Sequence, residues 1–279
     1  MGRVLAISSQ VARGHVGLSA IVPALHGLGH EAIALPTVLL SNHPGHSAAA
    51  GEPVAPTLLR RMLDALDANG WLGGIDAVMT GYLPSVEHVR FAAEAIGRVR
   101  ARARVGYLRV LVDPVLGDDG KGLYIDAGAA AAMRDDLVAC ADVVTPNVFE
   151  LGWLTQMAVD GAAEAIRAAA TLAPAAVLVT SVPAGADELE NVLVSKAGEA
   201  MACRVRRRSG APHGTGDLLA ALYLGHELKL GAARAPEVLA LAVAGVDAVI
   251  AASRGCDELR LVQTRDGWTD PGPFPVSRI

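Results

Sequence analysis

Cysteine is scarce in this chain, which has three among 279 residues. Cys140, Cys203 and Cys256 stand far apart, and no Cys-x-x-Cys pair occurs. A disulfide framework or a zinc site needs paired or clustered cysteines at short spacings. The spacing therefore argues against both, and we expect the three side chains to behave as small buried hydrophobes.

An excess of positive charge is also missing, because 24 Lys and Arg stand against 29 Asp and Glu, for a formal net charge of −5. Such a balance disfavours nucleic acid or an anionic membrane as a partner. One local basic cluster fits a solvated edge strand or a phosphate-facing surface. It consists of Arg204, Arg206, Arg207 and Arg208.

Long apolar runs are lacking as well. Hydrophobic residues make up 52% of the chain, but charge, Gly or Pro breaks the longest runs before they reach the length of a membrane span. The apolar part of Met1–Ser8 is too short for a signal peptide and fits a first strand. The sequence therefore predicts a cytoplasmic protein without a membrane segment.

The chain alternates short β-rich runs with longer Ala- and Leu-rich stretches, which is typical of an α/β sheet with crossover helices. Its length allows one domain over 1–279, or one domain with a small appendage. The predicted strands are Val4–Ser8, Glu31–Leu35, Ala77–Thr80, Val110–Asp113, Val143–Thr145 and Val177–Thr180, followed by a hairpin of Val192–Ser195 and Met201–Val205. The predicted helices are Leu18–Leu28, Thr57–Asn69, Val86–Arg102, Ala129–Cys140 and Ala162–Leu172, and two longer ones starting near Asp217 and Pro236.

A glycine-rich stretch, Pro212–Asp217, leads directly into one of these helices. Glycine permits positive φ and lets the backbone approach a ligand closely, and the unpaired N–H groups of a helix start attract anions. Gly214, Thr215 and Gly216 therefore indicate an anion-binding helix start.

Asp217, in the first turn of that helix, has two interpretations. It can act as a partner of the helix dipole, as first-turn acids often do. Beside a bound phosphate, however, a carboxylate opposes binding, so its presence makes sense if it removes a proton from an attacking hydroxyl. The second interpretation predicts phosphoryl transfer.

Polar groups follow several predicted strands at their carboxyl ends, where open α/β sheets bind ligands. Asp113 and Asp118 follow one strand, as a ligand site or as turn residues. Asn147 and Glu150 follow the next strand, after Thr145, and share one helical face. They either cap that helix or hold Mg²⁺ through water.

Two further segments complete the predicted site. Thr180 and Ser181 offer hydroxyls to donor phosphates, with an ordinary polar strand end as the alternative. Pro36–His46 fits a projecting strand and loop that covers a small polar ligand and excludes water. Its histidines, together with His15, lack the spacing and the carboxylate partners of a metal site.

These motifs together resemble the ribokinase-like superfamily and, within it, the pyridoxal kinase family. The superfamily features are Gly214-Thr215-Gly216-Asp217, Thr145-Pro146-Asn147 with Glu150, and Asp113-Pro114-Val115-Leu116-Gly117-Asp118. The features that narrow the resemblance are Ser9, Gly14-His15-Val16-Gly17, Ser41-Asn42-His43 and Thr80-Gly81-Tyr82. The match runs from the first strand to about Ala252.

The resemblance implies a three-layer fold, in which helices flank a mostly parallel central sheet and a small lid lies around residues 36–50. It also implies ATP-dependent, Mg²⁺-assisted phosphorylation of the 5-hydroxymethyl group of pyridoxal, to give pyridoxal 5′-phosphate in vitamin B6 salvage. Members of the family are usually homodimers. Action on pyridoxine or pyridoxamine and a requirement for a monovalent cation stay open.

The resemblance assigns roles residue by residue. Asp217 would be the base, and the anion hole would be Gly214, Thr215 and Gly216. ATP and its metal would be bound by Asp113, Asp118, Thr145, Asn147, Glu150, Thr180 and Ser181, of which Glu150, Asn147 and Asp113 would serve Mg²⁺. The vitamin pocket would be lined by Ser9, Thr37, Tyr82 and Asp217.

Two alternatives come from other classes of function. A kinase of the same fold could act on hydroxymethylpyrimidine or a sugar, and only pocket residues would separate it from a vitamin kinase. A non-catalytic nucleotide-binding regulator would have lost a catalytic group, whereas Asp217 and the anion hole are present. One departure from the family is Leu18, at a position that usually holds Asn.

Overall fold

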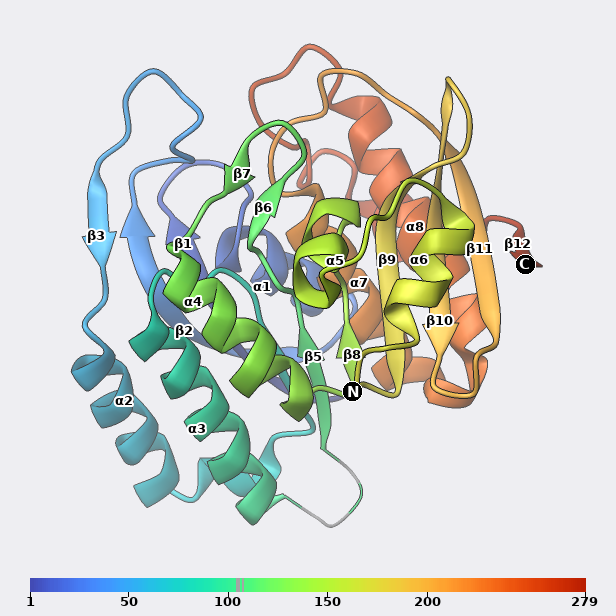
Figure 1. The fold of residues 1–279 in the computed structure, drawn as a ribbon. Coiled ribbons are helices and arrows are strands. Elements are labelled where there is room, and N and C mark those ends of the chain that lie inside the picture. Colours follow the sequence, from blue (N-terminus) through green and yellow to red (C-terminus); the bar gives the residue numbers. More distant parts are fainter. Residues whose placement is uncertain (104–105, 107) are drawn as a thin grey trace.

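The structure, a computed structural model, describes residues 1–103, 106 and 108–279. A ten-stranded sheet runs through them (Figure 1). Its strands are β1 (Arg3–Val11), β2 (Glu31–Leu40), β3 (Gly51–Pro53), β4 (Ala77–Thr80), β5 (Arg109–Val112), β8 (Val143–Val144), β9 (Ala176–Pro183), β10 (Glu188–Ser195), β11 (Ala200–Arg206) and β12 (Val276–Arg278). Across the sheet their order is β12-β11-β10-β9-β8-β5-β4-β1-β2-β3.

The middle of the sheet, from β2 to β9, is parallel. Antiparallel strands flank it, with β10, β11 and β12 at one edge and β3 at the other. The carboxyl ends of the parallel strands therefore share one side of the sheet, and so do the loops that follow them. The mostly parallel sheet and the β10–β11 hairpin confirm the predicted architecture.

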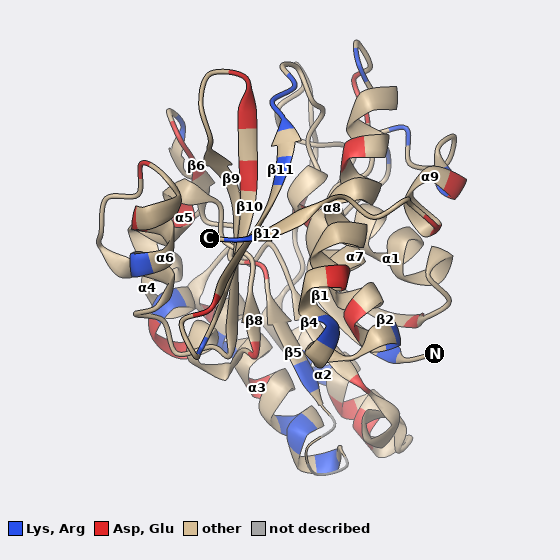
Figure 2. Ribbon diagram, turned by 90° about the vertical axis from the view of Figure 1, so that its right-hand side faces the viewer, with Lys and Arg blue, Asp and Glu red and all other residues tan. Residues whose placement is uncertain are grey.

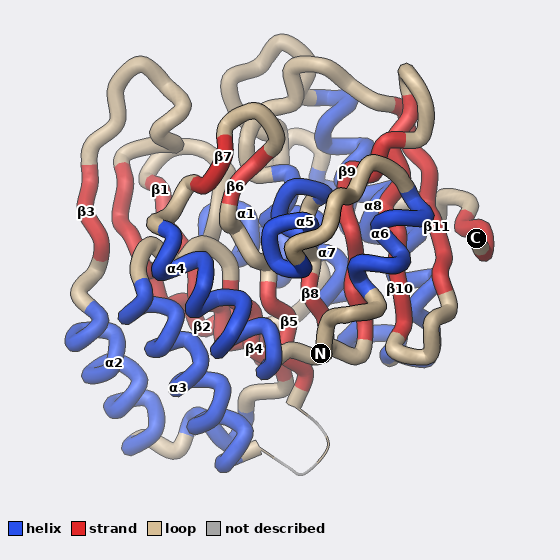
Figure 3. Tube along the Cα trace, in the orientation of Figure 1, coloured by secondary structure: helices blue, strands red, loops and turns tan. Residues whose placement is uncertain are grey.

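Helices cover both faces of the sheet. They are α1 (Leu18–Gly27), α2 (Pro56–Ala68), α3 (Val86–Arg102), α4 (Ala127–Ala132), α5 (Val148–Thr155), α6 (Ala162–Ala169), α7 (Thr215–Leu230), α8 (Ala235–Ala252) and α9 (Arg265–Thr269). The cores under the helices place α1, α7, α8 and α9 on one face and α2 to α6 on the other, so the sheet is the middle of three layers (Figures 1 and 3).

Strand side chains alternate between these two layers of helices. Val4 and Ala6 of β1 pack into the core beneath α1 and α7, whereas Leu5 and Ile7 pack into the core beneath α2 and α3. Successive residues of a strand point to opposite faces, so a strand covered on both faces is apolar throughout. This burial explains the continuous apolar runs in the sequence.

The predicted lid consists of the end of β2, the loop 41–50 and β3. β2 continues through Pro36 to Leu40, beyond the predicted strand end, and β3 returns antiparallel to it. Pro36 is tolerated because the pairing of β1 with β2 shifts register directly after it. The projecting segment therefore continues past residue 50 to Pro53, as a strand paired with β2.

Two other segments refine the predicted elements. The chain from Ala127 to Cys140 is helical, but a wider π-helical turn at Met133–Leu137 and a tighter turn at Val138–Cys140 follow α4. The tail has no regular structure from Pro271 to Pro275 and then pairs with β11 as β12 (Val276–Arg278). The open edge of β11 provides the backbone groups that this short strand needs.

The basic cluster lies along and after β11, beside acidic residues of neighbouring elements (Figure 2). Arg204 pairs with Glu190 of β10 at 2.7 Å, and Arg208 pairs with Asp247 of α8 at 2.9 Å. Because β12 covers part of β11, this strand is not the edge of the sheet. Half of the basic cluster is thus neutralised within the fold.

The segment Ala232–Ala252, which includes α8, is long and apolar enough to cross a membrane by length and composition alone. Charge, Pro and Gly do interrupt its apolar run, at Arg234, Pro236, Glu237, Gly245 and Asp247, but the residues between them keep the mean hydropathy of the segment high. Half of the segment is buried inside the protein, in the core that it shares with α7. This placement is that of a core helix.

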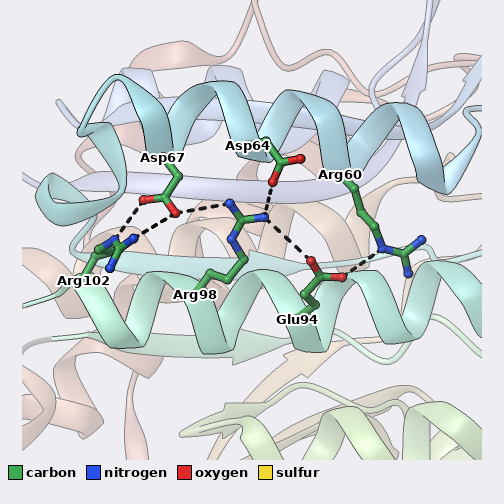
Figure 4. A network of polar contacts seen from close by, with 6 residues as sticks. All are labelled: Arg60, Asp64, Asp67, Glu94, Arg98 and Arg102. Atoms are coloured by element: carbon green, nitrogen blue, oxygen red, sulfur yellow. Dashed lines mark hydrogen bonds and ion pairs between the residues drawn. The ribbon is translucent and has the colours of Figure 1, made fainter.

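An ion-pair network joins the outer sides of α2 and α3 (Figure 4). Arg98 of α3 lies 2.7 Å from Asp64 and 3.2 Å from Asp67 of α2, and Arg102 lies 2.9 Å from Asp67. Exposed pairs of this kind stabilise a protein by about 0.2–1 kcal/mol each. The network therefore aligns two helices whose packing comes from their apolar faces.

His226 on α7 is a polar residue that the fold buries. Its side chain is 5% exposed, and among the described residues its Nε2 has no hydrogen-bond partner. Burial, together with the charges of Lys229 and His30, lowers the pKa of His226 from 6.5 to about 4. The folded protein therefore favours the neutral ring.

Acid should destabilise the protein through His226. Because its folded pKa lies below the ordinary value, the unfolded chain binds a proton first, and stability is lost as pH falls from about 6.5 towards 4. His226→Leu should reduce the loss of unfolding free energy between pH 7 and pH 5 by about 1–2 kcal/mol, measured by urea denaturation. Removal of exposed His26 is the control, and an equal effect of both changes would contradict the assignment.

Candidate active site

A cavity of about 630 Å³ opens at the carboxyl ends of the parallel strands. It lies between the lid, the loops after β1, β4, β5 and β8, and the start of α7. The predicted residues that line it are Ser9, Tyr82, Asp113, Asp118, Thr145, Asn147, Glu150, Thr180, Gly214, Gly216 and Asp217. The fold thus brings together side chains that are far apart in the sequence.

Three predicted residues do not line this cavity. Thr37 is fully buried, and its hydroxyl donates to the backbone carbonyl of Tyr82 at 2.7 Å, so the fold already uses the group. Ser181 is exposed, with φ of 58°. Thr215 is the first residue of α7, beside the two glycines that do reach the cavity.

The start of α7 is shaped by Gly214. Its φ is 100°, in the left-handed region that favours glycine, and the carbonyl of His15 occupies the space that a side chain would need. No side chain caps this helix start among the residues described, so its first N–H groups remain available to an anion. The structure thus provides uncapped N–H groups at this helix start, and anion binding there stays a prediction.

Asp217 and Asp113 place two carboxylates at the bottom of the cavity. Burial raises the pKa of Asp217 from 3.8 to about 6, although the Gly17 amide opposes this shift. Burial, and then the charge of Asp217, raise the pKa of Asp113 to about 7, against a hydrogen bond of 2.8 Å from Thr145. A carboxylate with a pKa near neutrality is suited to accept a proton.

Asn147 and Glu150 form a complete capping box at the start of α5. The Asn147 side chain accepts from the Glu150 N–H at 2.9 Å, and Glu150 Oε2 accepts from the Asn147 N–H at 2.8 Å. The other oxygen of Glu150 accepts from the Leu116 N–H at 3.0 Å, and the Asn147 amide donates to the Gly117 carbonyl at 2.9 Å. The capping alternative is therefore realised, and it ties α5 to the loop after β5.

The capping box limits how a metal can be held. Within residues 1–103, 106 and 108–279, no group of three or more His, Cys, Asp or Glu is placed to bind a metal ion by itself. Asp113 keeps one carboxylate oxygen without a hydrogen bond from these residues, whereas Asn147 and Glu150 use both polar side-chain atoms. Mg²⁺ commonly keeps several waters beside one or two carboxylates and substrate phosphates, so the donor set fits an ion that arrives with a nucleotide.

The backbone of Tyr82 is fixed by hydrogen bonds on both of its polar groups. Its N–H donates to Ser8 Oγ at 3.1 Å, and its carbonyl accepts from Thr37. Gly81 precedes it, where a side chain would collide with Ser8. β1 and β2 therefore determine where the Tyr82 ring meets the cavity.

The cavity also contains residues to which the sequence analysis gave no individual role. His43 of the lid, Lys121 and Tyr124 of the loop after β5, and His213 before the anion-binding glycine all line it. Their positions in loops that follow parallel strands, or directly beside Gly214, were the available signal. Their side-chain directions depend on tertiary packing.

Comparisons with known proteins agree with this geometry. Residues 13–252 match the phosphomethylpyrimidine kinase family. The chain is 34% identical to Pyridoxal kinase PdxY of Leifsonia xyli subsp. xyli, with 99% of each chain covered, and 36% identical to Pyridoxal kinase PdxY of Rubrobacter xylanophilus, with 99% and 97% covered.

Solved structures give the same result. Pyridoxal kinase from Entamoeba histolytica superposes with a TM-score of 0.93 at 26% identity, over 100% of both chains. Pyridoxal kinase from Leishmania donovani in complex with ADP and pyridoxamine superposes with a TM-score of 0.93 at 28% identity, also over 100% of both chains.

Fold and site together define a ribokinase-like kinase, with a buried carboxylate beside an anion-binding helix start at the carboxyl edge of a parallel sheet. This class accounts for the arrangement of all the motifs. The chain belongs to the phosphomethylpyrimidine kinase family and, within it, to the pyridoxal kinases. The resemblance inferred from the sequence is confirmed.

Glu150 should stabilise the fold as an ionised acceptor. Glu150→Gln places an NH₂ group against a backbone N–H that now donates to the carboxylate, so we expect a loss of about 1–3 kcal/mol in unfolding free energy. Burial and the charge of Asp113 raise the pKa of Glu150 well above its usual range. Hydrogen bonds from the backbone N–H groups of Asn147, Leu116 and Gly117 oppose this shift.

Urea denaturation at pH 8 measures this loss. Glu164→Gln is a matched control, because Glu164 also lies in a first helical turn but pairs with Arg167 at the surface. Unchanged stability of Glu150→Gln would mean that the fold holds Glu150 in its protonated form.

Proposed function

We propose that the protein transfers the γ-phosphoryl group of ATP to the 5-hydroxymethyl group of pyridoxal, giving pyridoxal 5′-phosphate and ADP. The observation that supports this most strongly is that Asp217, the anion-binding start of α7, and the pair Ser9 and Tyr82 line one cavity. The relatives named pyridoxal kinase support the same substrate class. Vitamin B6 salvage is the corresponding role.

Asp217 is the general base in this proposal. Its carboxylate takes the proton of the 5-hydroxymethyl group while the oxygen attacks the γ-phosphorus in line, and the bond from phosphorus to the β–γ bridging oxygen breaks as ADP leaves. Backbone N–H groups at Gly214, Thr215 and Gly216 stabilise the charge on the transferred group. No phosphoenzyme forms.

The donor side of the cavity is formed by the loops after β5 and β8 and by Thr180 of β9. We infer that the nucleotide and its metal are bound there by Asp113, Asp118, Thr145, Asn147, Glu150, Thr180 and Ser181. Asp113 would meet Mg²⁺ directly, and Asn147 and Glu150 would meet it through water, because their side chains already serve the capping box. The ion would neutralise phosphate charge.

The vitamin side rests on Ser9 and Tyr82. Ser9 is a short hydroxyl at the cavity, suited to a ring substituent, and Tyr82 offers an aromatic face for stacking. Thr37 acts through the Tyr82 carbonyl in this proposal, instead of touching the vitamin. The apolar lid residues Val38 and Leu40 complete a slot for a flat ring.

Three further expectations stay predictions. The resemblance implies a homodimer and leaves the use of a monovalent cation open, and the sequence predicts a cytoplasmic location. The single domain over 1–279 is likewise our proposal, supported by the one sheet that joins elements from both ends of the chain.

A second candidate substrate is hydroxymethylpyrimidine, favoured by the family that residues 13–252 match. With Mg-ATP, we expect kcat/KM for pyridoxal to exceed that for hydroxymethylpyrimidine and ribose by at least about tenfold, because a wrong ligand leaves buried polar groups unpaired at about 1–3 kcal/mol each. A coupled assay of ADP release across these substrates measures this. Equal turnover of the pyrimidine would overturn the vitamin assignment.

Asp217→Asn should lower kcat by about two to four powers of ten, the usual contribution of a positioned base, and leave ATP affinity near wild type. In the wild type, kcat/KM should fall as pH drops below about 6, where Asp217 becomes protonated. Initial rates and thermal melting are measured in parallel. Glu237→Gln, which removes a first-turn acid of α8, is the control, and a mutant Asp217→Asn that keeps most of its kcat would refute the base.

A further inference from the structure

The lid loop is held in one shape by its own hydrogen bonds. The Ser41 N–H donates to the Ala50 carbonyl at 2.7 Å, and the Ala50 N–H donates to Ser41 Oγ at 2.9 Å. The Asn42 amide donates to the Ala48 carbonyl at 2.9 Å. The loop 41–50 is therefore a closed unit that presents fixed side chains to the rest of the protein.

The first side chain that it presents is His43. The His43 ring stacks on His213, with ring centroids 3.8 Å apart and an interplanar angle of 21°. His213 directly precedes Gly214, and both histidines line the cavity. The lid thus rests on the segment that shapes the anion-binding helix start.

The second side chain is His46, whose Nε2 lies 3.2 Å from Glu258 Oε1. Glu258 belongs to the segment between α8 and α9, outside the family match at 13–252 and outside every role assigned so far. The two side chains are 31% and 19% exposed, so the contact is partly shielded from water.

Glu258 also contacts the loop after β1. A side chain at Gly14 would collide with the Glu258 carboxylate, and Glu258 partly offsets the burial that lowers the pKa of His15. The His15 carbonyl in turn fills the space beside Gly214. The contacts therefore form a closed series, from His46 through Glu258 and the loop after β1 to Gly214, and back to the lid through the stacked rings of His213 and His43.

We propose that Glu258 is a positioning residue that latches the lid over the active site by holding His46. This inference rests on the proposed function, because it assigns the latch to the vitamin side of the cavity. A closed lid excludes water from the transfer and keeps the vitamin beside Asp217. The latch joins three segments that no local motif connects.

The stacked rings suit the closed state at neutral pH. Burial, together with the charges of His213, His46 and Lys121, lowers the pKa of His43 from 6.5 to about 4. Burial also lowers the pKa of His213, as do Lys121 and His46, whereas Asp118 and Glu258 oppose that shift. Both rings are therefore uncharged near neutrality, and no charge repulsion opposes the stack.

The test compares Glu258→Ala, His46→Ala and the double variant with Asp257→Ala. Asp257 is the exposed neighbour of Glu258, so its removal is a matched loss of charge. We measure KM and kcat for pyridoxal, KM for ATP, and hydrogen exchange of the backbone amides of residues 41–50. The exchange measurement needs no turnover.

Glu258→Ala should raise KM for pyridoxal by about threefold to tenfold with little change in kcat or in KM for ATP, as loss of one partly exposed side-chain hydrogen bond allows. Exchange of the lid amides should become faster. His46→Ala should raise KM for pyridoxal to a similar extent, and the double variant should raise it no further than either single variant. Glu258→Gln should give a KM between those of the wild type and Glu258→Ala.

A Glu258→Ala variant that behaves like Asp257→Ala in both KM and exchange would overturn the latch, as would effects of Glu258→Ala and His46→Ala that multiply. A wild-type protein that fails to phosphorylate pyridoxal would instead overturn the proposed function. In that case the exchange rates of the lid amides still decide whether Glu258 holds the lid.

Discussion

The start of α7 is pressed against the loop after β1, and the geometry of the site depends on this contact. Gly214 adopts φ of 100° with the His15 carbonyl where a side chain would be. Further along, α7 is buried and anchored to β5 by two 2.7 Å bonds between Arg109 and Glu227. A helix fixed in this way holds its unpaired N–H groups and Asp217 in one place, which is what a preorganised phosphate site requires.

The same packing makes the site electrostatically costly. Asp113, Glu150 and Asp217 are gathered where burial raises the pKa of each of them. Backbone N–H groups and Thr145 offset part of this cost, but the carboxylates still favour a bound cation or proton. The two large cores, one on each face of the sheet, have to supply the stability that is lost at such a site.

Several polar groups that motif matching places around ligands serve the protein itself. The Thr37 hydroxyl holds the Tyr82 carbonyl, and the side chains of Asn147 and Glu150 are used in capping α5 and in holding the loop after β5. These groups shape the site by positioning the residues that meet the ligand. Such indirect roles are common around sites whose reactive groups must stay within a narrow geometry.

The sequence by itself determined features that arise from local backbone chemistry. The glycine-rich helix start at Gly214, the capping box of Asn147 and Glu150, and the apolar strand runs all follow from neighbouring residues. The order of these motifs along the chain was also sufficient to predict the superfamily and the mostly parallel centre of the sheet.

Only the tertiary structure decided which polar groups remain available and which distant segments meet. The residues around Thr37 in the sequence give no sign that its hydroxyl donates to the Tyr82 carbonyl. No local pattern brings His43 to His213 or His46 to Glu258. β12 likewise depends on the edge that β11 leaves open. Such contacts join residues far apart along the chain, so they exist only after the sheet and its helices have packed, and local propensity cannot specify them.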